Sequence, residues 1–275
     1  MALPTYPDRI PDGTLESACR LAELLRANMT VRVSQLDGDQ GTWPPVIGAF
    51  PLNFPGMMQE LVTQSEINAA ASCVAVERLC AEYEIKLDLR RALTMLYASP
   101  WDLIDLSRLH DLLILPVPEI DSFERSYIEP AIFQSGRPTL LMPSSGKQLQ
   151  SLDRVVLAWD YSREAARALA DSLPILRLAT EVHVLTAFGE KHIETCCVTG
   201  DLEKYLTTHQ IRYSLHQAAA GTEPIADIIL HYAKEINAGM LIMGAYGHSR
   251  IREFVLGGAS RGVLSRPALP ILLSH

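Results

Sequence analysis

The most constraining feature of this 275-residue sequence is an internal repeat, in which the order of apolar segments in the first half recurs in the second. Each half has short apolar runs, which are typical of buried strands, and between them stretches with apolar residues at helical spacing. Strands that alternate with helices predict a parallel sheet with helices on both faces. The matching segments are 29–36 and 180–187, 85–90 and 211–216, 112–115 and 240–243, and 137–142 and 269–274.

We therefore predict an α/β protein with two tandem Rossmann-like domains, each built on a parallel five-stranded sheet flanked by helices. The repeat places the first domain at residues 1–143 and the second at 150–275, with a short polar linker between them. The first strands differ, because residues 154–160 form a full strand pattern while residues 1–3 resemble only the end of one. Either a naturally short edge strand or a missing beginning explains this difference.

Composition limits the classes of partner. Hydrophobic residues make up 48% of the chain and charged residues 20%, which is typical of a globular protein with packed cores. The net charge of −8 argues against nonspecific binding to nucleic acid or to an acidic membrane surface. No apolar run approaches the roughly 18–20 residues of a membrane span, and the first residues do not resemble a signal peptide. Five cysteines, an odd number without metal-finger spacing, favour reduced thiols in the cytoplasm.

Glycines are concentrated near the end of the chain, between two predicted strands at 240–243 and 271–273. Gly244 directly follows the first of these strands, and ligands of open parallel sheets bind at that edge. Gly257 and Gly258 stand where a helix is expected to begin, and exposed N–H groups at a helix start favour an anion. These parts suit a ligand that carries phosphate. The alternative is that the glycines only allow tight turns.

The spacing G-x2-G-x9-G in this position resembles the nucleotide-binding signature of the universal stress protein family, with Gly244, Gly247 and Gly257 at its three glycine positions. The family usually has Ser or Thr directly after the third glycine. Here that residue is Gly258, and the next hydroxyl follows at Ser260. The resemblance covers the whole repeat, so the chain looks like a tandem universal stress protein.

This resemblance implies a stress-response protein that binds ATP or another adenine nucleotide, with Mg²⁺ beside the phosphates, in its second half. It also implies that the last strands of the two halves, at 139–142 and 271–273, pair as an intramolecular pseudo-dimer, and it leaves room for a homodimer. The output would be a ligand-dependent change in association or in partner binding. Nucleic acid and membranes are not expected partners.

The resemblance also assigns residues to the nucleotide. Asp160, at the end of the first strand of the second half, stands where nucleotide-binding members carry an Asp near the base and ribose, and a carboxylate accepts from ribose hydroxyls. The alternative is that Asp160 or Ser162 caps the next helix. His248 and Arg250 either pair with phosphates or are solvated. The predicted cofactor-binding residues are Asp160, Ser162, Ala187, Gly244, Gly247, His248, Arg250, Gly257, Gly258, Ala259 and Ser260.

The first half lacks this signature. Pro116 stands at the position of Gly244, and Glu119 at that of Gly247. Proline has no N–H to offer a phosphate, and Glu would place negative charge beside it. The first half also has Pro4 in place of the aspartate. We therefore predict that the first domain is degenerate and binds no phosphate.

No convincing set of catalytic residues is present. The sequence contains no P-loop and no G-x-G-x-x-G after the first strand. Hydrolysis of ATP needs a placed base and usually Mg²⁺ ligands, so at most a slow ATPase is expected. His192, Cys196 and Cys197 lack a fourth ligand, so we predict no metal site. Two alternatives stay open: a nucleotide-free interaction or scaffold protein, and a binder of an apolar ligand at the aromatic loop 37–56.

Overall fold

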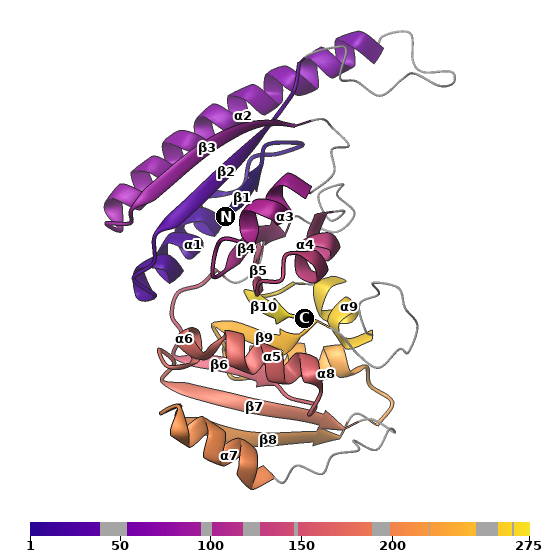
Figure 1. Ribbon diagram of the computed structural model, residues 1–275. Coiled ribbons are helices and arrows are strands. Elements are labelled where there is room, and N and C mark those ends of the chain that lie inside the picture. Colours follow the sequence, from indigo (N-terminus) through magenta and orange to yellow (C-terminus); the bar gives the residue numbers. More distant parts are fainter. Residues whose placement is uncertain are drawn as a thin grey trace. The chain divides into compact units, whose positions relative to one another are not determined.

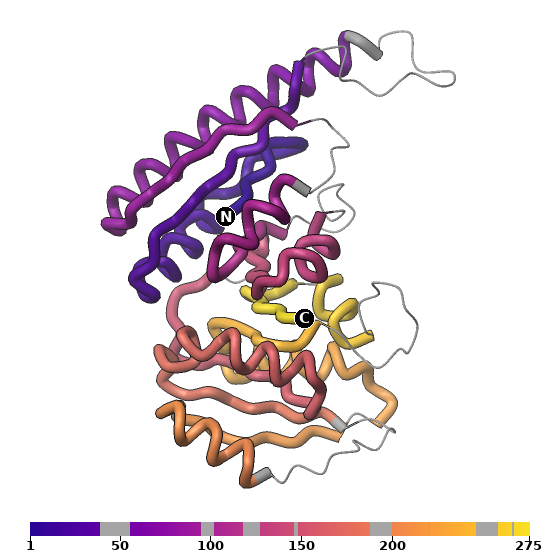
Figure 2. The backbone as a smooth tube through the Cα atoms, viewed as in Figure 1, coloured from indigo at the N-terminus to yellow at the C-terminus, as the bar shows by residue number. Residues whose placement is uncertain are grey.

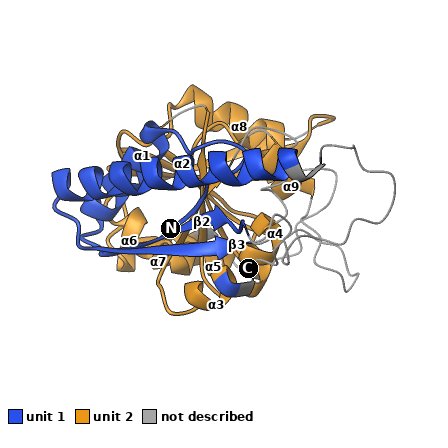
Figure 3. Cartoon of the chain, turned by 90° about the horizontal axis from the view of Figure 1, so that it is seen from above, with its two compact units in different colours: residues 1–102 blue, residues 103–275 orange. Residues whose placement is uncertain are grey.

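The computed structural model describes residues 1–38, 54–94, 101–117, 127–145, 148–188, 199–219, 221–245, 258–265 and 267–275. These residues form two compact units, Met1–Asp102 and Leu103–His275, which Figure 3 distinguishes by colour. Each unit has its own predominantly parallel sheet with helices packed on it, and Figure 2 follows the backbone through both. The predicted α/β class, with parallel sheets flanked by helices, is therefore confirmed.

Unit 1 is a parallel sheet with two helices packed on it. Its described elements before residue 101 are β1 (Ala2–Pro4), α1 (Asp12–Leu24), β2 (Met29–Leu36), α2 (Phe54–Glu82) and β3 (Leu87–Thr94). The strands lie in the order β1-β2-β3, and α2 packs on both α1 and β2. In β2, Met29, Val31 and Val33 are buried and alternate with partly exposed residues, as expected for a half-buried strand.

Unit 2 is built on a larger sheet. Its described strands are β4 (Leu113–Val117), β5 (Thr139–Pro143), β6 (Arg154–Ala158), β7 (Glu181–Phe188), β8 (Tyr213–Ala219), β9 (Met240–Gly244) and β10 (Ile271–Ser274). They lie in the order β4-β5-β10-β9-β6-β7-β8, and every neighbouring pair is parallel except β5 with β10. The described helices after residue 100 are α3 (Trp101–Ser107), α4 (Ile128–Gln134), α5 (Arg163–Asp171), α6 (Leu173–Leu176), α7 (Thr199–Thr208), α8 (Ile225–Glu235) and α9 (Gly258–Ser265).

The antiparallel pairing of β5 with β10 joins strands from the two halves of the repeat. Leu140 lies opposite Leu272, and every residue of both strands is buried. The predicted pairing of the last two strands is therefore confirmed. The same pairing adds β4 and β5 to the strands of the second half, so the described strands form sheets of three and seven, and the prediction of two five-stranded sheets was wrong. The predicted boundaries at 143 and 150 follow the sequence repeat and stay a prediction.

Helices cover both faces of the sheet in unit 2. α5 packs on β9 and β10, whereas α8 packs on β7 and α9 (Figure 1), and the view from above in Figure 3 shows α5 and α8 on opposite sides of unit 2. Met240, Leu241, Ile242 and Met243 of β9 are all buried. A strand that is covered on both sides has no polar face, which explains its unbroken apolar sequence.

Candidate functional site

Two chain connections leave the sheet of unit 2 in opposite directions beside its central strands. β6 lies between β7 and β9, and the chain proceeds from β6 to β7 on one side and from β9 to β10 on the other. This arrangement is a topological switch point, and ligands of parallel sheets bind outside the carboxyl ends of strands at such points. The residues that follow β6 and β9 therefore form the candidate site.

Asp160 and Ser162 shape the turn from β6 into α5. The Asp160 Oδ1 atom accepts a hydrogen bond of 3.0 Å from the N–H of Ser162, and Ser162 Oγ accepts one of 3.0 Å from the N–H of Ala165. Ser162 is the N-cap of α5, and Tyr161 before it has a left-handed φ of 62°. The capping alternative is therefore confirmed for Ser162. The carboxylate of Asp160 is partly exposed and has lone pairs beyond this bond.

Gly244 ends β9 in close contact with the first turn of α5. A Cβ atom at this position would lie 2.7 Å from the backbone carbon of Glu164 and 2.8 Å from the nitrogen of Ala165. These distances are too short for any side chain, so the packing of α5 on β9 requires glycine. The first glycine of the signature thus has a structural reason that does not depend on a ligand.

Ser260 anchors the start of α9 to the end of β9. Its Oγ donates a hydrogen bond of 3.2 Å to the carbonyl oxygen of Gly244, and the serine is only 3% exposed. The N–H of Ala245 donates to the carbonyl of Ser274 at 2.8 Å, which holds the same strand end against β10. The predicted phosphate hydroxyl therefore has its proton engaged by the main chain in this structure.

Gly258 and Ala259 open α9 beside this anchor. A Cβ atom on Gly258 would meet no described atom within 4 Å, so a larger side chain fits at that position. Gly258 is exposed and Ala259 partly exposed. Because the first N–H groups of a helix have no partner within the helix, this end of α9 can accept an anion.

Ala187 lies near the carboxyl end of β7, at the same edge of the sheet. It pairs with Ala218 of β8, and the neighbouring Leu185 carbonyl accepts a 2.9 Å hydrogen bond from the N–H of Trp159 just after β6. Asp160 and Ala187 thus follow adjacent strands. The predicted site residues Gly247, His248, Arg250 and Gly257 lie outside the described residues, as do His192, Cys196, Cys197 and the aromatic residues Trp43 and Phe50.

The structure also reveals groups at this edge that sequence reasoning missed. The indole N–H of Trp159 is buried without an acceptor among the described residues, and its ring lies edge-to-face with Tyr161 at 5.6 Å. Glu164 is 8% exposed and accepts a 2.8 Å hydrogen bond from Arg163. Trp159 and Tyr161 could have been found from the sequence, because two aromatic residues flank Asp160 there.

Residues 258–262 match the spacing G-x-S-x-G of hydrolase nucleophiles, so the expectation that the sequence has no such motif was wrong. In those enzymes the serine is exposed on a sharp turn between strand and helix. Ser260 instead lies inside α9, is buried, and donates to the Gly244 carbonyl. The match therefore does not mark a nucleophile.

Comparison with known proteins supports one family. No family model matches the sequence. Over 139 residues the chain is 28% identical to a universal stress protein of Synechocystis, a stretch that covers 50% of this chain and 46% of that protein. The crystal structure of a universal stress protein from Archaeoglobus fulgidus covers 100% of this chain and 97% of its own, with a TM-score of 0.69 at 19% identity. The chain has the universal stress protein fold.

A second solved structure agrees over the full length. A functionally unknown protein from Pseudomonas aeruginosa covers 99% of this chain and 91% of its own, with a TM-score of 0.60 at 12% identity. The curated universal stress protein is matched over less than half of its own length, so its activity and partners do not transfer to this chain. In the described part of the chain, no helix combines the length and the apolar character that crossing a membrane requires.

Proposed function

We propose that the second half of this chain binds ATP or another adenine nucleotide at the carboxyl edge of β6 and β9. Binding would change its association or its contact with a partner protein in a stress response. The observation that carries the proposal is the topological switch point between β6 and β9, because the turn after β6 and the start of α9, which Ser260 anchors to Gly244, both lie at this carboxyl edge of the sheet. A cytoplasmic location, Mg²⁺ beside the phosphates and a homodimer belong to the same proposal.

In this proposal, one group of residues contacts the nucleoside and another contacts the phosphates. The carboxylate of Asp160 would accept from a ribose hydroxyl or an exocyclic amine with its remaining lone pairs. The N–H groups of Gly258 and Ala259 would receive a phosphate at the positive end of the α9 dipole. Mg²⁺, when present, takes most of its ligands from phosphates and water. We assign no described residue as a general base for ATP hydrolysis, so we propose that the site binds nucleotide and does not hydrolyse it.

A second candidate is a nucleotide-free interaction protein. Gly244 is required by the packing of α5, Ser260 donates to a main-chain carbonyl, and Ser162 caps a helix. Each of these residues therefore has a role in the fold without a ligand. This observation favours the second candidate over a slow ATPase, for which no catalytic group is assigned.

Isothermal titration of Mg–ATP, ADP and AMP into the purified chain tests the proposal, with Gly258→Glu and Gly200→Glu as matched variants. Both glycines lie in the first turn of a helix, and a Cβ atom on either would meet no described atom within 4 Å. The described residues leave room for a Cβ atom at both positions, but only at position 258 does a glutamate place negative charge at the phosphate site. We expect saturable binding that Gly258→Glu abolishes and Gly200→Glu retains.

Two results would contradict the proposal. One is the absence of binding heat with all three nucleotides, together with no nucleotide released on denaturation of freshly purified protein. The other is equal loss of binding in both variants, which would place the nucleotide elsewhere or indicate a general effect of charge. Either result would leave the nucleotide-free interaction protein as the better description.

A further inference from the structure

Four polar side chains converge on the face of the sheet that α8 covers, away from the site after β6 and β9. His183 lies on β7, Ser214 and His216 lie on β8, and Tyr232 lies on α8. The Nδ1 atom of His183 is 3.0 Å from the Tyr232 hydroxyl, 3.2 Å from His216 Nε2 and 3.4 Å from Ser214 Oγ. The Ser214 hydroxyl is also 2.9 Å from His216 Nε2. Two oxygens and a second ring nitrogen therefore lie within 3.4 Å of the Nδ1 atom of His183.

The other nitrogen of His183 faces a carboxylate. Its Nε2 atom is 3.5 Å from the Glu181 Oε2 atom, and it has no hydrogen-bond partner among the described residues. A proton on Nε2 is favoured by that negative charge, and it leaves a lone pair on Nδ1 directed at the cluster. A carboxylate behind the outer nitrogen is the usual arrangement for a histidine that binds a metal, because it fixes the tautomer and raises the basicity of the ring.

The spacing of the two ring nitrogens is close to that of two ligands of a small tetrahedral ion. Ligands that lie about 2.0–2.1 Å from Zn²⁺ at tetrahedral angles are about 3.3–3.4 Å apart. The nitrogens of His183 and His216 are 3.2 Å apart, and the two rings have their centroids 5.1 Å apart. Without a metal, one proton shared between these two nitrogens satisfies them. A metal ion would replace that proton, which would move to the Nδ1 atom of His216, with a small outward movement of the oxygens.

We propose that His183, His216 and Tyr232 form a binding site for a divalent transition-metal ion of the Zn²⁺ class, with Ser214 or water as the fourth ligand. The two imidazole nitrogens are the anchoring ligands, since imidazole suits Zn²⁺, Ni²⁺ and Cu²⁺. Glu181 is a positioning residue. No group of three His, Cys, Asp or Glu side chains with metal-binding geometry occurs in the described part of the chain, so the remaining ligands of this site come from the tyrosine, the serine or water.

Burial supports this reading. His183 is 8% exposed, so the side of the site that it forms is shielded from water. His216, Ser214 and Tyr232 are partly exposed, which gives an ion a route to the site. The site is independent of the proposed nucleotide site. It also departs from the sequence-based prediction of no metal site, because its histidines are 33 residues apart in the sequence and no local spacing marks them.

Metal titration of tag-free, chelator-treated protein tests the proposal. Zn²⁺ binding is measured by calorimetry, and Co²⁺ is used as a spectroscopic probe because a tetrahedral site gives it intense visible bands. The key variant is His216→Ala, and the matched control is His231→Ala, which removes an exposed histidine beside Tyr232 on α8. We expect one Zn²⁺ per chain, a loss of affinity of at least about tenfold in His216→Ala, and no change in His231→Ala.

Tyr232→Phe separates a metal site from a structural cluster. It keeps the ring and removes only the oxygen, so we expect an intermediate loss of Zn²⁺ affinity and weaker visible Co²⁺ bands. Thermal unfolding with and without Zn²⁺ checks the fold, since the metal should raise the Tm of the wild type and of His231→Ala but not of His216→Ala. Zn²⁺ binding that is equal in the wild type and His216→Ala, or that falls equally in His231→Ala, would overturn the proposal and assign the cluster to packing alone.

Discussion

The end of β9 and the end of β4 occupy equivalent places in the repeat but have opposite chemistry. β9 stops at Gly244, whereas β4 continues through Pro116 to Val117. Pro116 lies opposite Met142 on the outermost described strand of its sheet, a position where a strand tolerates proline. The second half therefore offers a bare main chain at this edge, and the first half offers a residue without an N–H.

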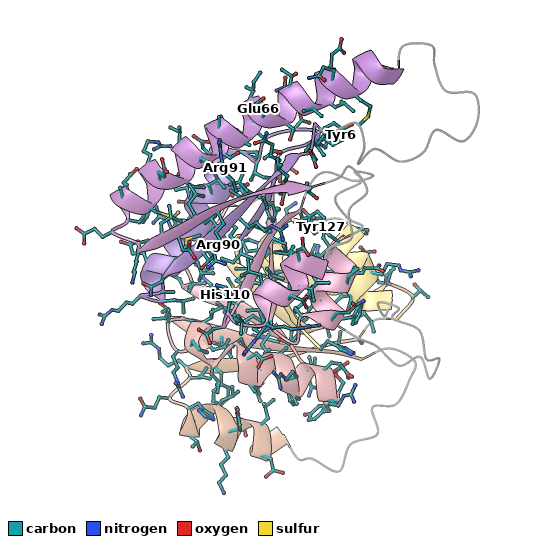
Figure 4. All side chains as sticks on the ribbon, turned by 45° about the horizontal axis from the view of Figure 1, so that its top comes forward. Tyr6, Glu66, Arg90, Arg91, His110 and Tyr127 are labelled. Carbon is teal, nitrogen blue, oxygen red and sulfur yellow. The ribbon has the colours of Figure 1, made fainter. Side chains whose placement is uncertain are left out.

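A similar hydrogen bond is nevertheless present at both strand ends. In the second half Ser260 donates to the Gly244 carbonyl at 3.2 Å, and in the first half the Tyr127 hydroxyl donates to the Pro116 carbonyl at 3.4 Å. Tyr127 is labelled in Figure 4. Because the half that lacks the glycine signature has an equivalent hydrogen bond, this bond stabilises the fold and is not evidence of a ligand site by itself. Besides the change from proline to glycine, the second half differs in having a small anchoring side chain, Ser260, in place of Tyr127.

The largest expected effect comes from giving Gly244 a side chain. Gly244→Ala places a Cβ atom 2.7 Å from the backbone of Glu164, and backbone cannot move aside as a side chain tip would. We expect a loss of about 1–3 kcal/mol in the free energy of unfolding, near the upper end of that range, as for other overpacked sites. Urea denaturation with an unchanged m-value measures it.

Gly258→Ala is the control for this change. Its Cβ atom meets no described atom within 4 Å, so the free energy of unfolding should change by less than about 0.5 kcal/mol. Equal stability of Gly244→Ala and wild type would contradict the packing argument. The glycine at the end of β9 would then be explained by approach of a ligand, and the contrast with Pro116 would be one of binding alone.

Ser260→Ala and Tyr127→Phe test whether the shared hydrogen bond is structural in both halves. Ser260 is buried, so its loss should cost about 1 kcal/mol of stability, and the longer bond of Tyr127 should cost less. Nucleotide affinity should change little in either variant, because the Ser260 proton is already engaged. A fall of about tenfold or more in ATP affinity with unchanged stability would instead make Ser260 a phosphate ligand.

The order of strands and helices along the chain could largely be predicted from the sequence, whereas the distribution of the strands between two sheets could not. The apolar segments 139–142 and 271–273 were predicted to pair, and they lie side by side as β5 and β10. Fully buried strands have the same sequence pattern whichever neighbour they take. A repeat of five strand patterns therefore cannot reveal that β4 and β5 belong to a different sheet from β1, β2 and β3, because that depends on contacts far apart in the sequence.

The parts of the candidate site that depend on contacts between residues close in the sequence could be predicted. The cap at Ser162 follows from the three residues after it, and a capping signal can be read in sequence. The bond from Ser260 to Gly244 spans 16 residues, and the approach of His183 to Tyr232 spans 49. Such contacts depend on which helix covers which strand, and no residue spacing records that.

Gly258→Ser sharpens the comparison by restoring the hydroxyl that the family signature carries after its third glycine. The position is exposed and open, so the serine should fit without loss of stability. One added hydrogen bond to phosphate is expected to tighten ATP binding by about two- to tenfold. Calorimetry beside Gly200→Ser, the equivalent change in the first turn of α7, measures this gain. Unchanged affinity would argue against phosphate at the start of α9.

The smallest expected effect is a change in the pKa of His275, which lies where the two halves of the repeat meet. His275 follows β10, and its ring lies edge-to-face with Phe133 of α4 at 4.9 Å. Burial lowers the pKa of His275 below its ordinary value of 6.5, with a partly opposing contribution from Glu164. The unfolded chain therefore binds this proton more readily than the folded chain. The contribution of His275 to stability is complete above pH 6.5 and is lost as the pH falls through the lowered pKa.

An NMR titration of the His275 ring measures this pKa, with Phe133→Ala as the informative variant. His275 is exposed overall and its ring is only partly shielded, so removing Phe133 exposes the ring further and the pKa of His275 should rise toward 6.5. A pKa that is already ordinary in the wild type would mean that α4 does not cover the end of β10 in solution. The antiparallel pairing of β5 with β10 would then hold the two halves together at this end without help from the helix that precedes β5.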